Sequence, residues 1–281
     1  MASRTADRAV GCHTNGRRVV TVFFIGAGPG AADLITLRGA RVLGECTTCL
    51  YAGSLVPQEL LELCPAGATL IDTARMPLDE IIGHIVEADA SGADVARLHS
   101  GDISLYSAFT EQHRELRRLG IGVEIVPGVP AFAAAAAALD TELTVPGVGQ
   151  SLLITRVSTL STDMPPGEEL AHLAQSGVTL ALHLAAHRAP QIVEALADHY
   201  GPQCPTATVA FASRDDQVVI RCALSDLPQR LDDHGIRRTA VIFVGKVLDP
   251  ATSTPTDSYL YSHARMTKLR SGGHDDRPST T

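Results

Sequence analysis

The feature that most constrains the fold is a short apolar run that leads straight into a glycine-rich turn. Residues 20–25 are mostly β-branched or aromatic, and Gly26-Ala27-Gly28-Pro29-Gly30 follows them. Such a run predicts a buried strand, and the turn after it predicts the start of a helix. Glycines lack a Cβ, so the backbone at this junction can come close to a bound molecule. The segment therefore predicts the first βα unit of an α/β fold, with a ligand near the turn.

The same turn fits the dinucleotide-binding pattern G-x-G-x-x-G/A through Gly26, Gly28 and Ala31. A dinucleotide site also needs an acidic residue at the end of the second strand, about 20 residues further on, to bind the ribose. The predicted second strand ends in Ala52-Gly53-Ser54 instead. Pro29 removes one N–H that a pyrophosphate would use. These departures argue against a dinucleotide-binding function.

Strand and helix patterns alternate over the first half of the chain. Asp33 is interpreted as the N-cap of the first helix, and Gly120 as the left-handed C-cap of the last. This alternation predicts βαβ units and a mostly parallel sheet. The predicted strands cover 20–25, 47–52, 68–72, 94–98 and 122–126, and the predicted helices cover 34–45, 57–63, 78–90 and 105–119.

A second α/β unit follows the break at Pro127-Gly128-Val129-Pro130 and the alanine run 133–138. Residues 214–217 predict a hairpin turn, so we expect the second sheet to be mixed. The length of 281 residues accommodates two α/β domains. We expect domains over 19–128 and 129–250, with a flexible arm over 1–18 and a largely flexible tail over 251–281. The predicted strands lie near 150–155, 178–184, 206–211, 217–221 and 239–245, with helices near 167–176, 189–200 and 225–234.

Composition excludes several classes of function. The net charge of −8 and the aromatic content of 4%, with no Trp, argue against a nucleic-acid-binding protein. No segment reaches the roughly 18 unbroken apolar residues of a membrane helix. The first eighteen residues hold arginines without an apolar core segment, so they do not form a secretory signal. Together with scattered cysteines, this predicts a cytoplasmic protein that does not bind membranes.

Patterns for metal binding and hydrolysis are incomplete. Cys46-x-x-Cys49 has no second CxxC, and we interpret these cysteines as small core residues. His183 and His187 have the spacing of a zinc pair, but Leu184 stands where H-E-x-x-H has its glutamate. No glycine lies two residues before Ser100, as a nucleophile elbow requires. We therefore expect neither a metal site nor a serine hydrolase.

Ligands of open α/β sheets bind beyond the carboxyl ends of the strands. Small residues and loop breakers recur at the predicted strand ends, which suits a flat or elongated ligand. The segments expected there are 26–30, 51–54, 73–76, 99–106 and 127–130, and in the second unit 155–156, 184–185, 212–214 and 245–246.

The motifs in these loops resemble those of the tetrapyrrole methylases, over about residues 20–265. The shared motifs are Gly26-Ala27-Gly28-Pro29-Gly30 with Asp33-Leu34-Ile35-Thr36, Ser100-Gly101-Asp102 with Tyr106, and Pro127-Gly128-Val129. Narrower motifs are similar to a branch that methylates C11 of a corrin precursor in cobalamin biosynthesis. They are 51–56, 73–76 with 78–81, 142–146 with Gln150, 155–156 and, in shortened form, 260–265.

The resemblance implies two α/β domains with an active-site cleft between them, and S-adenosylmethionine as cofactor. It further implies a small-molecule tetrapyrrole substrate and a homodimer. Methyl transfer from the sulfonium to a ring carbon is an in-line displacement, so we expect positioning to dominate. The carbon nucleophile belongs to the electron-rich substrate, and no catalytic residue is assigned.

The resemblance also implies the site residues. By match to the family, the cofactor is surrounded largely by main-chain groups of Pro29, Gly101, Asp102, Ile103, Tyr106, Pro130, Ala131, Leu184, Ala212 and Ala240. The substrate carries acetate and propionate carboxylates, which guanidinium groups bind bidentately. The candidates at strand ends are Arg75, Arg156 and Arg214, with Arg265 as a further one.

The chain departs from the family pattern in two places. Ile103 stands where the family usually has proline, and the segment 157–166 has extra length. The first change leaves the loop geometry open, and the second leaves substrate contacts open. The alternatives are a methylase of the same fold with another target, such as another ring position, diphthine or ribosomal RNA, and a non-catalytic tetrapyrrole-binding module.

Overall fold

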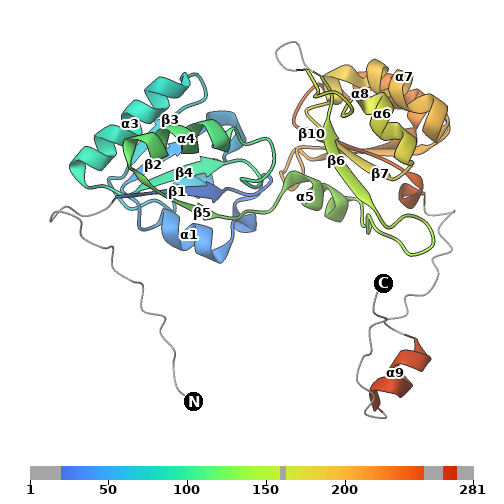
Figure 1. Cartoon of the computed structure of the whole chain (residues 1–281), viewed down its shortest axis with the longest axis horizontal. Coiled ribbons are helices and arrows are strands. Elements are labelled where there is room, and N and C mark those ends of the chain that lie inside the picture. Colours follow the sequence, from blue (N-terminus) through green and yellow to red (C-terminus); the bar gives the residue numbers. More distant parts are fainter. Residues whose placement is uncertain (1–19, 159–162, 250–261, 271–281) are drawn as a thin grey trace. The chain divides into compact units, whose positions relative to one another are not determined.

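The computed structural model describes residues 20–158, 163–249 and 262–270, and it divides into two compact units (Figure 1). Unit 1 contains the described residues up to Ala134 together with Ala212–Asp215, and unit 2 contains Ala135–Phe211 and the described residues from Asp216 onward. The predicted arm over 1–18 lies outside the described residues. Within the predicted tail, His263–Arg270 form helix α9. None of the described helices is long and apolar enough to cross a membrane.

Unit 1 is built on a five-stranded sheet with the order β3-β2-β4-β1-β5, in which all strands are parallel. This confirms the predicted parallel sheet. The strands are β1 (Thr21–Gly26), β2 (Thr48–Tyr51), β3 (Thr69–Asp72), β4 (Val95–His99) and β5 (Gly122–Val126). The helices are α1 (Leu37–Leu43), α2 (Gln58–Leu61), α3 (Leu78–Ser91) and α4 (Phe109–Leu119).

Helices cover both faces of this sheet (Figure 1). Leu43 of α1 and Leu60 of α2 belong to one buried apolar cluster, and Ile85 of α3 and Leu116 of α4 belong to the cluster on the other face. The chain therefore leaves β1 toward one face and leaves the neighbouring strand β4 toward the opposite face. This is a topological switch point, beside which open α/β sheets bind ligands.

Unit 2 has a mixed five-stranded sheet with the order β6-β7-β10-β8-β9, which confirms the prediction. Strands β6 and β7 are parallel, β10 is antiparallel to β7 and β8, and β8 with β9 forms the predicted hairpin. Helices α6, α7 and α8 pack on one face of the sheet through Leu170, Ile192 and Leu227. The strands are β6 (Leu152–Arg156), β7 (Thr179–His183), β8 (Pro205–Ala210), β9 (Val218–Ala223) and β10 (Ala240–Val244). The helices are α6 (Leu170–Leu173), α7 (Ala189–Tyr200) and α8 (Leu227–Asp233). Helix α5 (Ala131–Ala138) begins in unit 1 and ends in unit 2, because the chain passes from one unit to the other after Ala134.

The first helix begins later than predicted. Ala32–Leu34 form a 3-10 turn, and α1 starts at Leu37. Thr36 is its N-cap, because the Thr36 hydroxyl accepts a hydrogen bond from the Gly39 N–H at 3.1 Å. The prediction that Asp33 caps this helix is therefore wrong, since Asp33 lies inside the 3-10 turn. Gly120 is confirmed as a left-handed C-cap of α4, with φ of 72°.

Candidate functional site

The loops that follow β1 and β4 are joined directly by main-chain hydrogen bonds at the switch point. The Gly101 N–H donates to the Gly28 carbonyl at 2.7 Å, and the Gly28 N–H donates to the Gly101 carbonyl at 3.2 Å. Ala27 adds a third bond, from its N–H to the His99 carbonyl at 2.8 Å. The glycine-rich turn after β1 is thereby fixed to the loop after β4.

Two glycines let the loops after β1, β4 and β5 pack backbone against backbone. A Cβ placed on Gly26 would lie 2.5 Å from the Gly128 Cα, and a Cβ on Gly128 would lie 2.2 Å from the Gly101 oxygen. Real Cβ atoms do not tolerate such distances. We expected the glycines to admit a ligand, but at Gly26 and Gly128 the close neighbour is the adjacent loop. Their first effect is to hold the edge of the sheet together.

The structure also gives a physical reason against a dinucleotide at the glycine turn. A Cβ on Gly30 would lie 2.5 Å from the Arg214 Cγ and 2.8 Å from the Ala212 oxygen. The Ala31 N–H donates to the Ser213 hydroxyl at 3.0 Å. The segment Ala212–Asp215 thus occupies the space in front of this part of the turn. Only the 3-10 turn Ala32–Leu34 follows directly, and α1 begins at Leu37, so no α-helix N-terminus stands at the turn to receive a pyrophosphate.

Asp102 links the loop after β4 to the loop after β5. Its Oδ2 accepts a hydrogen bond from the Gly128 N–H at 2.7 Å, and its Oδ1 accepts from the Ser104 N–H at 2.9 Å and from the Ser104 hydroxyl. Partial burial by itself raises the pKa of Asp102, but the hydrogen bonds outweigh it and lower the pKa. The carboxylate is therefore engaged by the protein, and it orders the loop that was predicted to hold the cofactor.

Asp72 joins the loops after β2 and β3 in the same way. Its Oδ1 accepts from the Gly53 N–H at 2.8 Å and from the Ala74 N–H at 2.9 Å, and these bonds lower the pKa of the carboxyl. The carboxyl edge of unit 1 is therefore a set of loops tied to their neighbours by short main-chain contacts. Arg75 follows directly in one of them.

The segment between β4 and α4 forms a hollow of about 590 Å³ at this edge, a volume in the range of small-molecule sites. Ser104, Tyr106, Ser107, Glu111 and Arg114 are among its lining residues. The backbone here is unusual, because Tyr106 and Ala108 both have φ of 53°. The hollow thus combines polar side chains with a conformation that non-glycine residues rarely adopt.

The structure places most of the predicted cofactor residues in unit 1. The loops after β1, β4 and β5 contribute Pro29, Gly101, Asp102, Ile103, Tyr106, Pro130 and Ala131, and Ala212 belongs to the same unit. In unit 2, Leu184 follows β7 and Ala240 begins β10, and the pairing of Ile242 with Leu182 brings both to one edge of the sheet.

These residues fit a cofactor that is held mainly by main-chain groups. The Ile103 side chain is buried in the apolar cluster under α3 and α4, so only its backbone is available. That burial also anchors the loop where the family has proline. The Tyr106 side chain is 45% exposed, so it can contact a ligand. Ala131 begins α5, and the first N–H groups of a helix have no acceptors within the helix, so they can donate to a ligand.

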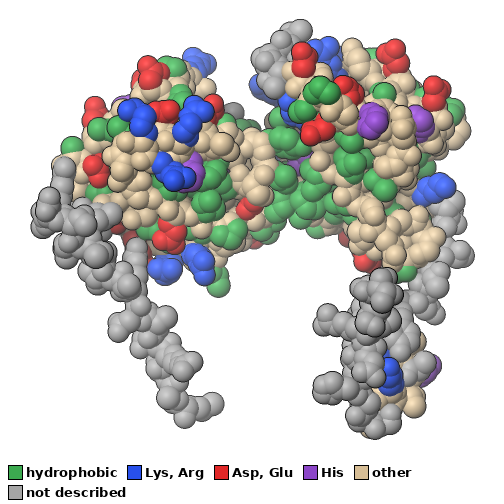
Figure 2. Space-filling view, viewed as in Figure 1, with side chains coloured by type: hydrophobic (Ala, Val, Ile, Leu, Met, Phe, Trp, Pro, Cys, Tyr) green, Lys and Arg blue, Asp and Glu red, His purple; other side chains and the backbone are tan. Residues whose placement is uncertain are grey.

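The predicted substrate arginines fall in both units. Arg75 and Arg214 are exposed residues of unit 1. Arg156 ends β6 in unit 2 and donates to the Val157 oxygen at 3.2 Å and the Asp163 oxygen at 3.3 Å. Arg265 lies in α9. On the face drawn in Figure 2, basic and acidic side chains are interspersed over the described residues of each unit, without the broad basic surface typical of nucleic-acid binding.

Two buried polar residues lie in β4: Arg97, which the sequence reasoning did not single out, and His99, which it placed in the loop after the strand. Arg97 is 6% exposed and His99 is 8% exposed. Burial and the charge of Arg97 lower the pKa of His99 to about 3, although a hydrogen bond with the Ser107 backbone opposes the shift. The available signal was the pattern Val95-Ala96-Arg97-Leu98-His99, which puts two basic residues in a strand expected to be buried on both faces.

Comparison with known proteins shows which family the chain resembles over most of its length. Residues 21–228 match the model of the Tetrapyrrole (Corrin/Porphyrin) Methylases. A precorrin-4 C(11)-methyltransferase of Rhodococcus erythropolis is 58% identical over 246 residues, covering 88% of this chain and 98% of the relative.

Two solved structures are also similar. A cobalt-precorrin-4 methyltransferase of cobalamin biosynthesis matches with a TM-score of 0.80 at 37% identity, covering 82% of this chain and 96% of the other. A uroporphyrin-III C-methyltransferase from Thermus thermophilus, complexed with S-adenosylhomocysteine, matches with a TM-score of 0.68 at 27% identity, covering 81% and 93%. The chain belongs to the tetrapyrrole methylases, as its loop motifs predicted.

Proposed function

We propose that this chain transfers the methyl group of S-adenosylmethionine to C11 of precorrin-4, giving precorrin-5 in cobalamin biosynthesis. The observation that carries the proposal is the likeness to a precorrin-4 C(11)-methyltransferase over nearly the full length of that relative. A cobalt-containing form of the same substrate is the second candidate, because one similar solved structure is a cobalt-precorrin-4 methyltransferase.

The cofactor, when bound, supplies an electrophilic methyl group. We propose that the chain's part is to orient the two reactants, since in-line displacement depends on alignment of the reacting atoms. Main-chain groups of Pro29, Gly101 and Ala131 hold the cofactor, and Asp102 keeps their loops in place through its bond to Gly128. The remaining proposed cofactor contacts are Ile103, Tyr106, Pro130, Leu184, Ala212 and Ala240.

Substrate carboxylates are bound by Arg75, Arg156 and Arg214 in this proposal. Arg156→Ala tests it, because loss of a charge-assisted contact costs about 1.5–3 kcal/mol and raises the KM for the tetrapyrrole at least about tenfold. The affinity for S-adenosylhomocysteine, measured by calorimetry, stays within about twofold. Arg237→Ala, at a surface arginine of the same unit, is the matched control. Unchanged kinetics of Arg156→Ala would remove that residue from the site.

Product analysis tests the reaction itself. The protein is incubated with precorrin-4 and S-adenosylmethionine carrying a labelled methyl group, and mass spectrometry and NMR then locate the label. Label at C11 is the expected result. Label at another carbon would identify a methylase with a different ring position. Pigment binding without transfer would favour the non-catalytic module.

We further propose that the enzyme works in the cytoplasm as a homodimer, as the family resemblance implies. Sedimentation equilibrium of the full chain tests the assembly, with a mass of two chains expected. A single-chain mass across the concentrations used in the assay would contradict it.

A further inference from the structure

Arg97 carries a positive charge into the interior of unit 1. It is 6% exposed, and burial lowers its pKa to about 10. Among residues 20–158, 163–249 and 262–270, no carboxylate lies within ion-pair distance of its guanidinium. A buried cation without a counter-charge is costly, so apolar packing alone does not explain an arginine at this position.

The guanidinium holds two neutral acceptors on different elements. Its Nε donates to the Gln112 Oε1 at 3.1 Å on α4, and its Nη1 donates to the Thr73 hydroxyl at 2.9 Å in the loop after β3. Gln112 and Thr73 are themselves buried, at 4% and 5% exposure. Arginine suits this geometry because its planar fork presents N–H groups in fixed, divergent directions.

Each partner passes the constraint to a loop. Thr73 lies two residues before Arg75 in the chain, and its hydroxyl donates to the Tyr51 carbonyl at 3.0 Å. The Gln112 amide donates to the Ala108 carbonyl at 3.1 Å, two residues after Tyr106. Ala108 also lines the hollow between β4 and α4. A single buried side chain thus connects a loop proposed to bind substrate with a loop proposed to bind cofactor.

We infer that Arg97 is a positioning residue that sets the loop of Thr73 and Arg75 in register with the loop of Tyr106 and Ala108. The inference rests on the proposed function, since it takes these loops as the substrate and cofactor sides of the reaction. Arg97 has one arm to each loop, so the two effects can be separated by removing one acceptor at a time.

Thr73→Val removes the hydroxyl at similar volume and cuts the arm to the substrate loop. We expect the KM for the tetrapyrrole to rise about fivefold, as one lost hydrogen bond would produce, with S-adenosylhomocysteine affinity within about twofold. Gln112→Leu cuts the other arm, and the dissociation constant for S-adenosylhomocysteine should rise about fivefold. Arg97→Met should show both defects.

Two further variants guard against a simple loss of folding. Arg97→Lys keeps the charge but cannot reach both acceptors as a fork does, so we expect it to restore one of the two constants and not both. In the double variant Arg97→Met/Thr73→Val, the tetrapyrrole KM should be no higher than in Arg97→Met, because the arm is already absent. Arg117→Met, at an exposed arginine of α4, is the matched control and should behave as the wild type.

The measurements are steady-state kinetics for both reactants, calorimetry with S-adenosylhomocysteine, and thermal unfolding of each variant. A lower melting temperature with both constants unchanged would overturn the inference, since Arg97 would then serve stability alone. A wild-type protein without methyl transfer would contradict the proposed function instead. In that case unchanged S-adenosylhomocysteine affinity in Gln112→Leu would still overturn the inference, and weakened affinity would support its cofactor arm.

Discussion

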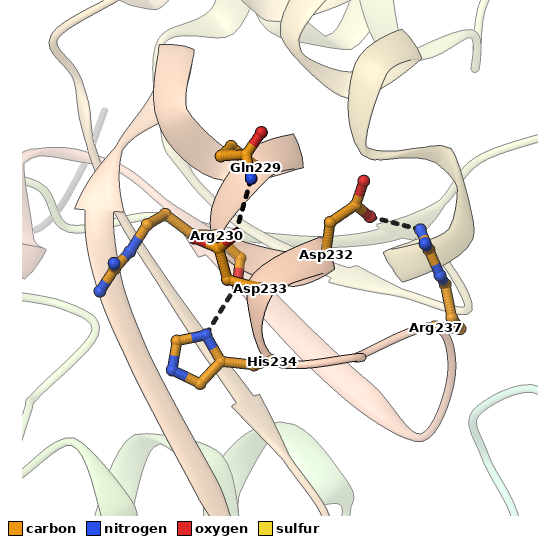
Figure 3. A network of polar contacts seen from close by, with 6 residues as sticks. All are labelled: Gln229, Arg230, Asp232, Asp233, His234 and Arg237. Carbon is orange, nitrogen blue, oxygen red and sulfur yellow. Dashed lines mark hydrogen bonds and ion pairs between the residues drawn. The ribbon is translucent and has the colours of Figure 1, made fainter.

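The two units bury polar side chains in different ways. The buried charged, imidazole and amide groups of the described residues, Arg97, His99 and Gln112, all lie in unit 1. In unit 2 the buried polar residues among the described ones are all threonines, such as Thr208. A network of side-chain contacts lies at the exposed end of α8, where the Gln229 amide donates to Asp233, the His234 ring contacts the Arg230 carbonyl and Arg237 pairs with Asp232 (Figure 3).

This difference shows that two α/β units of similar size can divide their tasks. The interior of unit 1 connects the loops at the carboxyl edge of its sheet through Arg97, Thr73 and Gln112, and we propose that these buried polar groups serve the reaction. The core of unit 2 is mainly apolar packing between the sheet and α6, α7 and α8.

Gly128→Ala should have the largest effect, because its Cβ would collide with the Gly101 oxygen, a backbone atom that cannot turn aside. We expect a loss of about 3 kcal/mol or more in the free energy of unfolding, together with weaker S-adenosylhomocysteine binding. Gly83→Ala in α3 is the control, since nothing lies within 4 Å of its added Cβ. That change should stabilise the helix by up to about 1 kcal/mol. Equal urea midpoints for the two variants would refute close loop packing.

His99 should make unit 1 sensitive to acid. Its folded pKa of about 3 lies below the ordinary value of 6.5, so between these values the unfolded chain takes up a proton that the folded chain does not. Its contribution to stability is therefore complete above pH 6.5 and decreases at lower pH by about 1.4 kcal/mol per pH unit. His99→Gln does not titrate, so its urea-denaturation series from pH 7 to 4 should fall less steeply. Parallel curves would contradict the assignment.

Thr208→Val in unit 2 should raise the free energy of unfolding, whereas Gly128→Ala in unit 1 should lower it. The Thr208 hydroxyl is buried in β8 and has no hydrogen-bond partner among the described residues. Replacing it by a methyl group of similar size should stabilise the protein by about 1 kcal/mol, because an unsatisfied polar group leaves the core. Thr73→Val in unit 1, whose hydroxyl both accepts and donates, should destabilise. Urea denaturation of the pair measures the contrast, and effects of the same sign would weaken the comparison.

Arg237→Ala should have the smallest effect. The Arg237 and Asp232 side chains are 64% and 52% exposed, and surface ion pairs contribute about 0.5 kcal/mol or less in water. The melting temperature should change by nearly the same amount between low and high salt in the wild type and in the variant. A destabilisation comparable to that of Gly128→Ala would mean that the surface network of unit 2 is as important as the buried network of unit 1.

Much of the fold could be predicted from sequence, because apolar runs and glycine or proline breaks are local signals. The start of α1 could not, since Asp33 and Thr36 are both good caps and tertiary packing selects between them. The cofactor residues came from a family resemblance. That Ile103 turns into the core and Asp102 toward Gly128 depends on contacts between loops far apart in the chain.

The buried network of β4 was the least predictable part. Arg97 and His99 stand two residues apart on a strand with apolar neighbours, which is a visible irregularity. The partners of Arg97 give no such signal in the sequence. Gln112 is 15 residues from Arg97 and Thr73 is 24, and neither spacing has a local signature. Such a network becomes visible only when the fold brings the loop after β3 and helix α4 to the side chain of Arg97 in β4.

We propose that the interlocked loops after β1, β4 and β5 receive the methyl donor. Hydrogen–deuterium exchange of the full chain, with and without S-adenosylhomocysteine, tests it most directly. We expect exchange to slow on binding in segments 26–31, 99–108 and 127–133. Unchanged exchange in all three segments, with slowing confined to the helices of unit 2, would contradict it.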